Sequence, residues 1–109
     1  MRLVMSKTIE WDGSSGKKYK YWIFDIDYKF QPKQPGNYVI TRQTETHKWK
    51  PIYIGQTSDL GKLFDDLPKI PCLSDNGATH IHAHKNKKEA SRLAEEADLI
   101  DSWHPVCND

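Results

Sequence analysis

The sequence predicts a small single-domain α+β fold in which short strands come first and a helix closes the chain. Three observations favour it: a hairpin pattern near the N-terminus, two β-rich runs in the middle, and an amphipathic pattern near the C-terminus. A chain of 109 residues has the usual length of one domain. With 37% hydrophobic and 28% charged residues, its composition is that of a globular protein.

The N-terminal segment has the pattern of a β-hairpin. Residues 7–11 and 17–27 are rich in β-forming side chains, and residues 12–16 between them are Gly, Ser and Asp, which favour turns. A proline-containing linker follows. We therefore expect residues 1–35 to form an accessory hairpin and linker. Three large apolar side chains of this hairpin are expected to be buried against the main domain: Trp11, Trp22 and Phe24.

The middle of the chain predicts three further strands. Residues 37–42 and 49–55 are β-rich, and the polar residues 43–48 between them are expected to form a loop. A short helix is expected over residues 59–66, before two prolines. Residues 79–84 predict the last strand.

The C-terminal helix has the clearest pattern. Asn86 is a suitable N-cap for a helix from about residue 87 to residue 103, and His104-Pro105 ends it. At 100° per residue, one face is apolar and is expected to pack on the sheet: Ala90, Leu93, Ala94, Ala97 and Ile100.

Charge, cysteine content and hydropathy limit the functional classes. A formal net charge of +1 gives no general support for nucleic-acid binding, so that support must come from local clusters. Cys72 and Cys107 fit no zinc or redox spacing and are expected to be free thiols. No apolar run could span a membrane, and the N-terminus is too short and too polar for a secretory signal, so we expect a cytoplasmic protein.

Short motifs occur in a distinctive order along the chain. Gly36-Asn37-Tyr38 begins one strand, Tyr53-Ile54-Gly55 ends the next, and an acidic helix precedes Pro105-Val106-Cys107-Asn108. Over residues 36–108 this order resembles the GIY-YIG nuclease superfamily. The resemblance implies a core of one small three-stranded antiparallel sheet flanked by helices. It also implies an endonuclease that hydrolyses DNA phosphodiester bonds.

The same resemblance implies roles for individual residues. Tyr38 and Tyr53 match the two tyrosines of the active site, and Asn108 matches the asparagine that closes it. Glu96 matches the carboxylate that holds one divalent cation, for which Mg²⁺ or Mn²⁺ suits oxygen ligands. The cation would polarise the phosphate. The base would be a tyrosine of lowered pKa, or a tyrosine bridged to the metal-bound water.

Two positions depart from the family pattern, and one of them is Leu67, which stands where the family often has a histidine. Leu63 stands where the family has an arginine, and leucine cannot neutralise a phosphate. Lys62 and Lys69 are the nearest candidates to bind phosphate in its place. Because loss of one electrostatic donor costs about 10²–10³ in rate, we expect weak or absent cleavage. The alternative is a non-catalytic module that binds nucleic acid or protein on the same fold.

Histidines and basic residues lie at the last strand and the start of the helix. His80, His82 and His84 alternate and therefore share one face of the strand, where they could form a metal site. We favour a solvent-facing polar side, with Ile81 and Ala83 inward. The candidate nucleic-acid contacts in this region are His82, His84, Lys85, Lys88 and Arg92.

Overall fold

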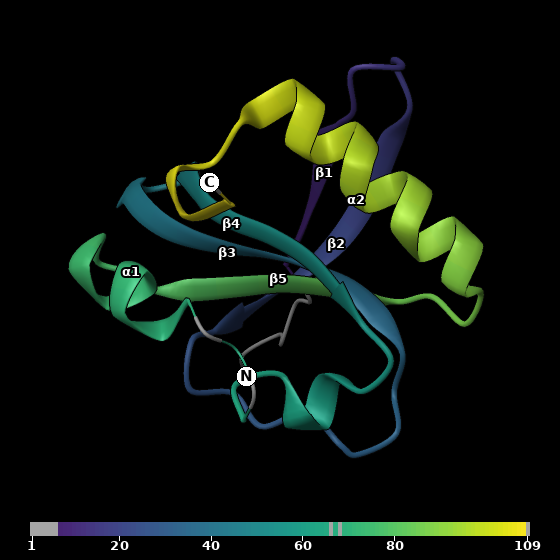
Figure 1. The fold of residues 1–109 in the computed structure, drawn as a ribbon. Coiled ribbons are helices and arrows are strands. Elements are labelled where there is room, and N and C mark those ends of the chain that lie inside the picture. The colour runs from purple at the N-terminus through teal and green to yellow at the C-terminus, as the bar shows by residue number, and fades with distance from the viewer. Residues whose placement is uncertain (1–6, 66, 68, 109) are drawn as a thin grey trace, which may run out of the picture.

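The computed structural model describes residues 7–65, 67 and 69–108, and it contains one curled antiparallel sheet of five strands (Figure 1). The strands, in the spatial order β1-β2-β5-β3-β4, are β1 Thr8–Asp12, β2 Lys18–Asp25, β5 His80–Lys85, β3 Gly36–Glu45 and β4 Lys48–Thr57. The helices are α1 Ile70–Asp75 and α2 Glu89–Trp103, with short 3-10 turns at η1 Leu60–Lys62 and η2 Val106–Asn108. No helix in the described chain has the length and apolar character needed to cross a membrane.

The expected three-stranded sheet flanked by helices is wrong. Strand β2 pairs with β5, with Trp22 opposite Ala83, so the N-terminal hairpin extends the sheet. The three expected strands are its β5-β3-β4 part. The physical reason is the edge of β5, whose backbone N–H and C=O groups would otherwise lack partners. Sequence reasoning treated the hairpin as a separate layer because pairing between distant strands leaves no local signal.

The hairpin buries two of its three large apolar side chains. Trp11 is 3% exposed, and Phe24 packs against the core. Trp22 is 41% exposed, so the expectation that it is buried is wrong. It alternates along β2 with Tyr21, and only the Tyr21 side of the strand is covered by α2.

The loop expected at residues 43–48 is mostly strand. Strand β3 continues to Glu45 and β4 begins at Lys48, so two residues form the turn. One of them, His47, has a φ of 64°. Cross-strand pairing therefore outweighs the polar composition of this segment.

The segment between β4 and β5 also differs from expectation. The helix predicted over residues 59–66 is only the 3-10 turn η1, which Asp59 caps through Gly61 N–H. The expected helix end at Asp66 and Pro68 lies outside the described residues. Helix α1 was not predicted; Pro71 lies in its first turn, where a missing N–H costs no hydrogen bond.

Helix α2 packs on one face of the sheet, but not through its apolar side. Its buried residues are Arg92, Glu95 and Leu99, whereas Leu93 is 46% exposed. The expected apolar face is therefore wrong, because the sheet under α2 presents polar groups that this polar face satisfies. The opposite face of the sheet carries an apolar core with η1 and α1: Tyr38, Ile40, Ile52, Leu60, Leu63, Leu73, Ile81 and Ala83.

The two cysteines form a disulfide, so the expectation of free thiols is wrong. Cys72 in α1 and Cys107 in η2 have Cα atoms 5.9 Å apart and are separated by 35 residues in sequence. The disulfide ties the C-terminal turn to α1. Because the pairing depends on the fold of the last third of the chain, no sequence spacing indicated it.

Candidate active site

The two motif tyrosines lie together on adjacent antiparallel strands. Tyr38 comes from β3 and Tyr53 from β4, and their ring centroids are 6.0 Å apart. Tyr38 is 4% exposed and Tyr53 is half-buried. Both side chains belong to the apolar side of the sheet, where they pack with the core.

Gly55 makes this arrangement sterically feasible. It lies directly across from Tyr38, and a Cβ atom at position 55 would come within 2.5 Å of the Tyr38 hydroxyl and ring. It would also come within 3.0 Å of the Tyr53 ring. The glycine of the Tyr-Ile-Gly motif is therefore the residue over which the two tyrosines meet.

Glu96 approaches the tyrosines from the other side of the sheet. It lies on α2, which packs chiefly along the edge strand β4. Burial raises the pKa of its carboxyl, and a hydrogen bond from the backbone of Gln56 partly offsets that shift. The carboxylate is close enough to contribute to the raised pKa values of Tyr38 and Tyr53.

A cavity of about 340 Å³ opens beside the tyrosines. Its lining includes Tyr38, Tyr53, Gln56, Lys62 and Leu63. Glu96 contacts Gln56 in this wall but does not itself line the cavity. Among the described residues that line the cavity, Lys62 is basic and Asp59 is acidic.

Leu63 has become a core residue as well as a cavity wall. It is 7% exposed and packs in the apolar cluster with Leu60 and Leu73. Lys69, the second expected phosphate ligand, is the N-cap residue of α1 and does not line the cavity. Of the two, only Lys62 is placed beside the tyrosines.

Neither tyrosine has the lowered pKa that a free-standing base would need. Burial raises the pKa of Tyr38, and the nearby Tyr53 and Glu96 raise it further. Burial and Glu96 also raise the pKa of Tyr53, although a hydrogen bond from Tyr38 opposes them. The suggestion of a low-pKa tyrosine base is therefore wrong for the free protein, in which both hydroxyls are neutral hydrogen-bonding groups.

Asn108 binds the backbone of the edge strand. Ile54 N–H donates to Asn108 Oδ1 at 2.8 Å, and Asn108 Nδ2 donates to the Ile54 carbonyl at 2.8 Å. The amide thus acts like a short additional strand along β4. Both ends of its side chain are used in this way, so the structure gives Asn108 a structural contact beside Tyr53.

The three histidines of β5 are less exposed than expected: His82 is buried, and His80 and His84 are half-buried. His82 is fully buried, accepts a hydrogen bond from Trp11 Nε1 at 3.0 Å and lies 3.2 Å from Thr41 Oγ1. Burial lowers its pKa to about 3. The polar solvent side proposed for this strand is therefore wrong, because Trp11, Trp49 and Glu95 pack against these side chains. His82 cannot contact nucleic acid.

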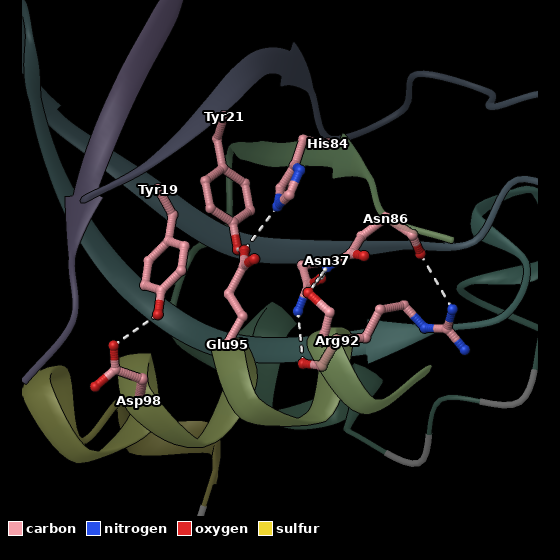
Figure 2. Close-up of polar contacts among 9 residues, drawn as sticks. Tyr19, Tyr21, Asn37, His84, Asn86, Arg92, Glu95 and Asp98 are labelled. Carbon is pink, nitrogen blue, oxygen red and sulfur yellow. Dashed lines mark hydrogen bonds and ion pairs between the residues drawn. The ribbon is translucent and has the colours of Figure 1, made fainter. Parts of the chain in front are cut away.

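A polar network joins α2 to the sheet (Figure 2). Glu95, which is 5% exposed, accepts a hydrogen bond from the Tyr21 hydroxyl and lies 2.6 Å from His84 Nε2. One turn further along α2, Asp98 accepts a 2.7 Å hydrogen bond from the Tyr19 hydroxyl. The two tyrosines of β2 are thus matched by two carboxylates of α2.

Arg92 completes the network at the start of α2. Its Nε donates to Gln56 Oε1 at 2.9 Å, and its Nη1 donates to the carbonyls of Asn86 and Lys87. Asn37 Nδ2 donates to the Arg92 carbonyl at 2.9 Å (Figure 2). Arg92 is 5% exposed, so its expected contact with nucleic acid is wrong.

The remaining candidate contacts divide into two groups. His84 is held by Glu95, whereas Lys85 and Lys88 are exposed. Sequence reasoning missed Glu95 because the apolar pattern placed it on the solvent side. A signal was present: buried tyrosine hydroxyls need partners, and Tyr19 and Tyr21 alternate on one strand face.

Comparisons with known proteins found no match: no model of a known protein family fits the chain, and searches of curated proteins and of solved structures gave no significant similarity.

Proposed function

We propose that this protein is a GIY-YIG-like endonuclease domain that binds DNA and hydrolyses phosphodiester bonds slowly. The observation that carries the proposal is the meeting of Tyr38 and Tyr53 over Gly55, beside a cavity that contains Lys62. The Glu96 carboxylate lies near both hydroxyls. The order of the strands β5-β3-β4 gives further support, because it places the two tyrosine strands side by side.

The residues at the site suit a single hard cation. Glu96 is a half-buried carboxylate, and the described residues contain no cluster of three or more His, Cys, Asp or Glu that could hold a metal. Mg²⁺ and Mn²⁺ tolerate this because they retain several waters and use one or two carboxylates. Glu96 would hold the ion, which when bound supplies positive charge against the phosphate.

The chain's own residues would orient the substrate. The neutral hydroxyls of Tyr38 and Tyr53 can donate to phosphate oxygens or position a water molecule. Lys62 can neutralise part of the phosphate charge, but its ammonium lacks the bidentate fork of arginine. Slow cleavage follows from this substitution, since Leu63 supplies no charge.

Plasmid nicking with Mg²⁺ or Mn²⁺ tests the proposal. We expect weak nicking that Glu96→Gln abolishes and Lys62→Gln lowers by roughly tenfold or more. Lys62→Arg should raise it. The matched controls are Glu89→Gln at the exposed start of α2 and Lys50→Gln on β4. Nicking that persists in Glu96→Gln would mean a contaminating nuclease and would contradict the proposal.

Leu63→Arg is a poor test of the missing charge. Because Leu63 lies in the apolar core, a buried guanidinium there should cost a few kcal/mol of stability. Any gain in charge would be masked by unfolding. Lys62 offers the same cavity without disturbing the core.

A second candidate is a non-catalytic nucleic-acid-binding module on the same fold. The observation in its favour is the conversion of position 63 into core, together with the raised pKa values of both tyrosines. DNA binding without any metal-dependent nicking, unaffected by Lys62→Arg, would select this candidate.

We further propose that the protein is located in the cytoplasm. The Cys72–Cys107 disulfide opposes it, because such bonds are rare in reducing compartments. Alkylation of the protein in freshly lysed cells distinguishes the cases. Two reactive thiols would support the cytoplasm, and a protected pair would contradict it.

A further inference from the structure

A second and larger cavity lies on the face of β2 and β5 opposite α2. This aromatic groove has a volume of about 710 Å³, within the range of ligand-binding pockets. Its floor is formed by β2 and β5, which lie side by side (Figure 1), and its wall by the segment from Tyr28 to Gln34. Leu60 of η1 borders it, whereas the tyrosine cavity begins on the other side of η1 with Lys62 and Leu63.

Two aromatic rings of the groove are exposed to solvent. Trp22 is 41% exposed and Tyr28 is 49% exposed. Tyr28 packs against Phe24 at 4.5 Å and against Phe30 at 4.9 Å between ring centroids, so it is held in place. A contiguous exposed apolar patch of this kind often marks a binding site.

The charges around the rings are positive. Lys20 Nζ lies 5.2 Å from the centroid of the Trp22 ring, and Lys85 lines the groove from β5. The described residues that line the groove include no Asp or Glu. Asp25, the carboxylate nearest along β2, is paired with His80 at 3.4 Å. The groove therefore complements an anionic ligand with flat apolar parts.

We propose that this groove binds single-stranded nucleic acid, with bases stacked on Trp22 and Tyr28 and the backbone phosphates near Lys20 and Lys85. Unpaired bases present the faces that such rings recognise, and duplex DNA hides them. Gln31 and Gln34 in the lining can donate to and accept from base edges. This binding goes beyond the cleavage proposed above and does not require it.

Fluorescence anisotropy with a labelled oligothymidylate in EDTA tests the proposal, because cleavage cannot then interfere. We expect the single strand to bind more tightly than the same strand annealed to its complement. Trp22→Ala and Tyr28→Ala should each weaken binding by roughly 5- to 100-fold, whereas Trp22→Phe and Tyr28→Phe should retain most of it. The ring-retaining variants control for folding.

The salt dependence of binding tests the two lysines separately. Lys20→Gln and Lys85→Gln should each reduce the slope of log affinity against log salt concentration by about 0.7, and Lys50→Gln on β4 should leave the slope unchanged. Equal affinity for duplex and single strand, indifference to Trp22→Ala, or binding of a proline-rich peptide in place of the oligonucleotide would each overturn the proposal. None of these results bears on plasmid nicking, which tests the cleavage proposal alone.

Discussion

The two faces of the sheet are packed through different physical interactions. Under α2, an apolar cluster that includes Leu99 is accompanied by buried charged and amide groups. Glu95, Arg92 and Asn37 each have specific hydrogen-bond partners there. On the other face, the core is built from apolar and aromatic side chains, with Ile40 and Ile81 fully buried. No buried side-chain nitrogen or oxygen of the described residues lacks a hydrogen bond.

The two faces therefore differ in how they respond to substitutions and in how strictly they position α2. An apolar core tolerates changes that conserve volume, whereas a buried polar network loses much when a single partner is removed. The polar face therefore fixes the position of α2, and with it the position of Glu96 relative to β4. The tyrosines project from the apolar face, so the candidate active site depends on both.

The largest effect is expected on the polar face. Glu95→Ala removes the acceptor of the buried Tyr21 hydroxyl and the partner of His84. We expect the free energy of unfolding to fall by about 3–5 kcal/mol, measured by urea denaturation. Ile81→Val on the apolar face should cost only about 0.5–1.5 kcal/mol.

Two further variants sharpen that contrast. Glu89→Ala, at an exposed position of the same helix, should change stability by no more than about 0.5 kcal/mol. Tyr21→Phe should cost less in the Glu95→Ala background than in the natural sequence, because its hydroxyl then has no acceptor to lose. Additive losses would contradict the network.

The polar face should also be the acid-sensitive one. Burial lowers the pKa of His82 from 6.5 to about 3, so the folded protein binds fewer protons there than the unfolded chain. The contribution of neutral His82 to the free energy of unfolding is fully present above about pH 6.5 and is lost as pH falls toward 3. The slope is up to about 1.4 kcal/mol per pH unit. Denaturation at several pH values, beside His82→Gln, measures that slope. An unchanged slope in the variant would assign acid sensitivity to other groups.

The sequence was most informative where structure is local. The two hairpin strands around the turn at residues 12–16 were predicted correctly, and so was the end of α2 before Pro105. Such patterns follow from the periodicity of one element. They need no knowledge of what packs against it.

The failures arose where tertiary contacts decide. Leu93 was expected inside and Glu95 outside, because hydrophobicity alone ranks them so; the tyrosine hydroxyls on β2 reverse the order. The pairing of β2 with β5 and the Cys72–Cys107 disulfide join segments far apart in the chain. Of the candidate site, the adjacency of Tyr38 and Tyr53 was predictable from their motifs, whereas the core role of Leu63 was not.

A smaller effect than at Glu95 is expected at the edge strand, where Asn108 binds Ile54. Asn108→Ala removes two hydrogen bonds to a strand edge that water can then solvate, so we expect a loss of only about 1 kcal/mol. Local exchange reports the contact more sharply than global unfolding does. The Ile54 amide should exchange with solvent much faster in the variant, while the amide of Ile81 in the central strand β5 should be unaffected.

Asn108→Asp separates the structural contact of Asn108 with Ile54 from a role in catalysis. The carboxylate keeps an acceptor for Ile54 N–H but cannot donate to the Ile54 carbonyl, so stability should fall at least as far as in Asn108→Ala. An asparagine that serves only the edge strand should affect nicking in proportion to the fraction of folded protein. Loss of nicking in fully folded Asn108→Ala, with Ile54 exchange unchanged, would instead place Asn108 in the chemistry of the site.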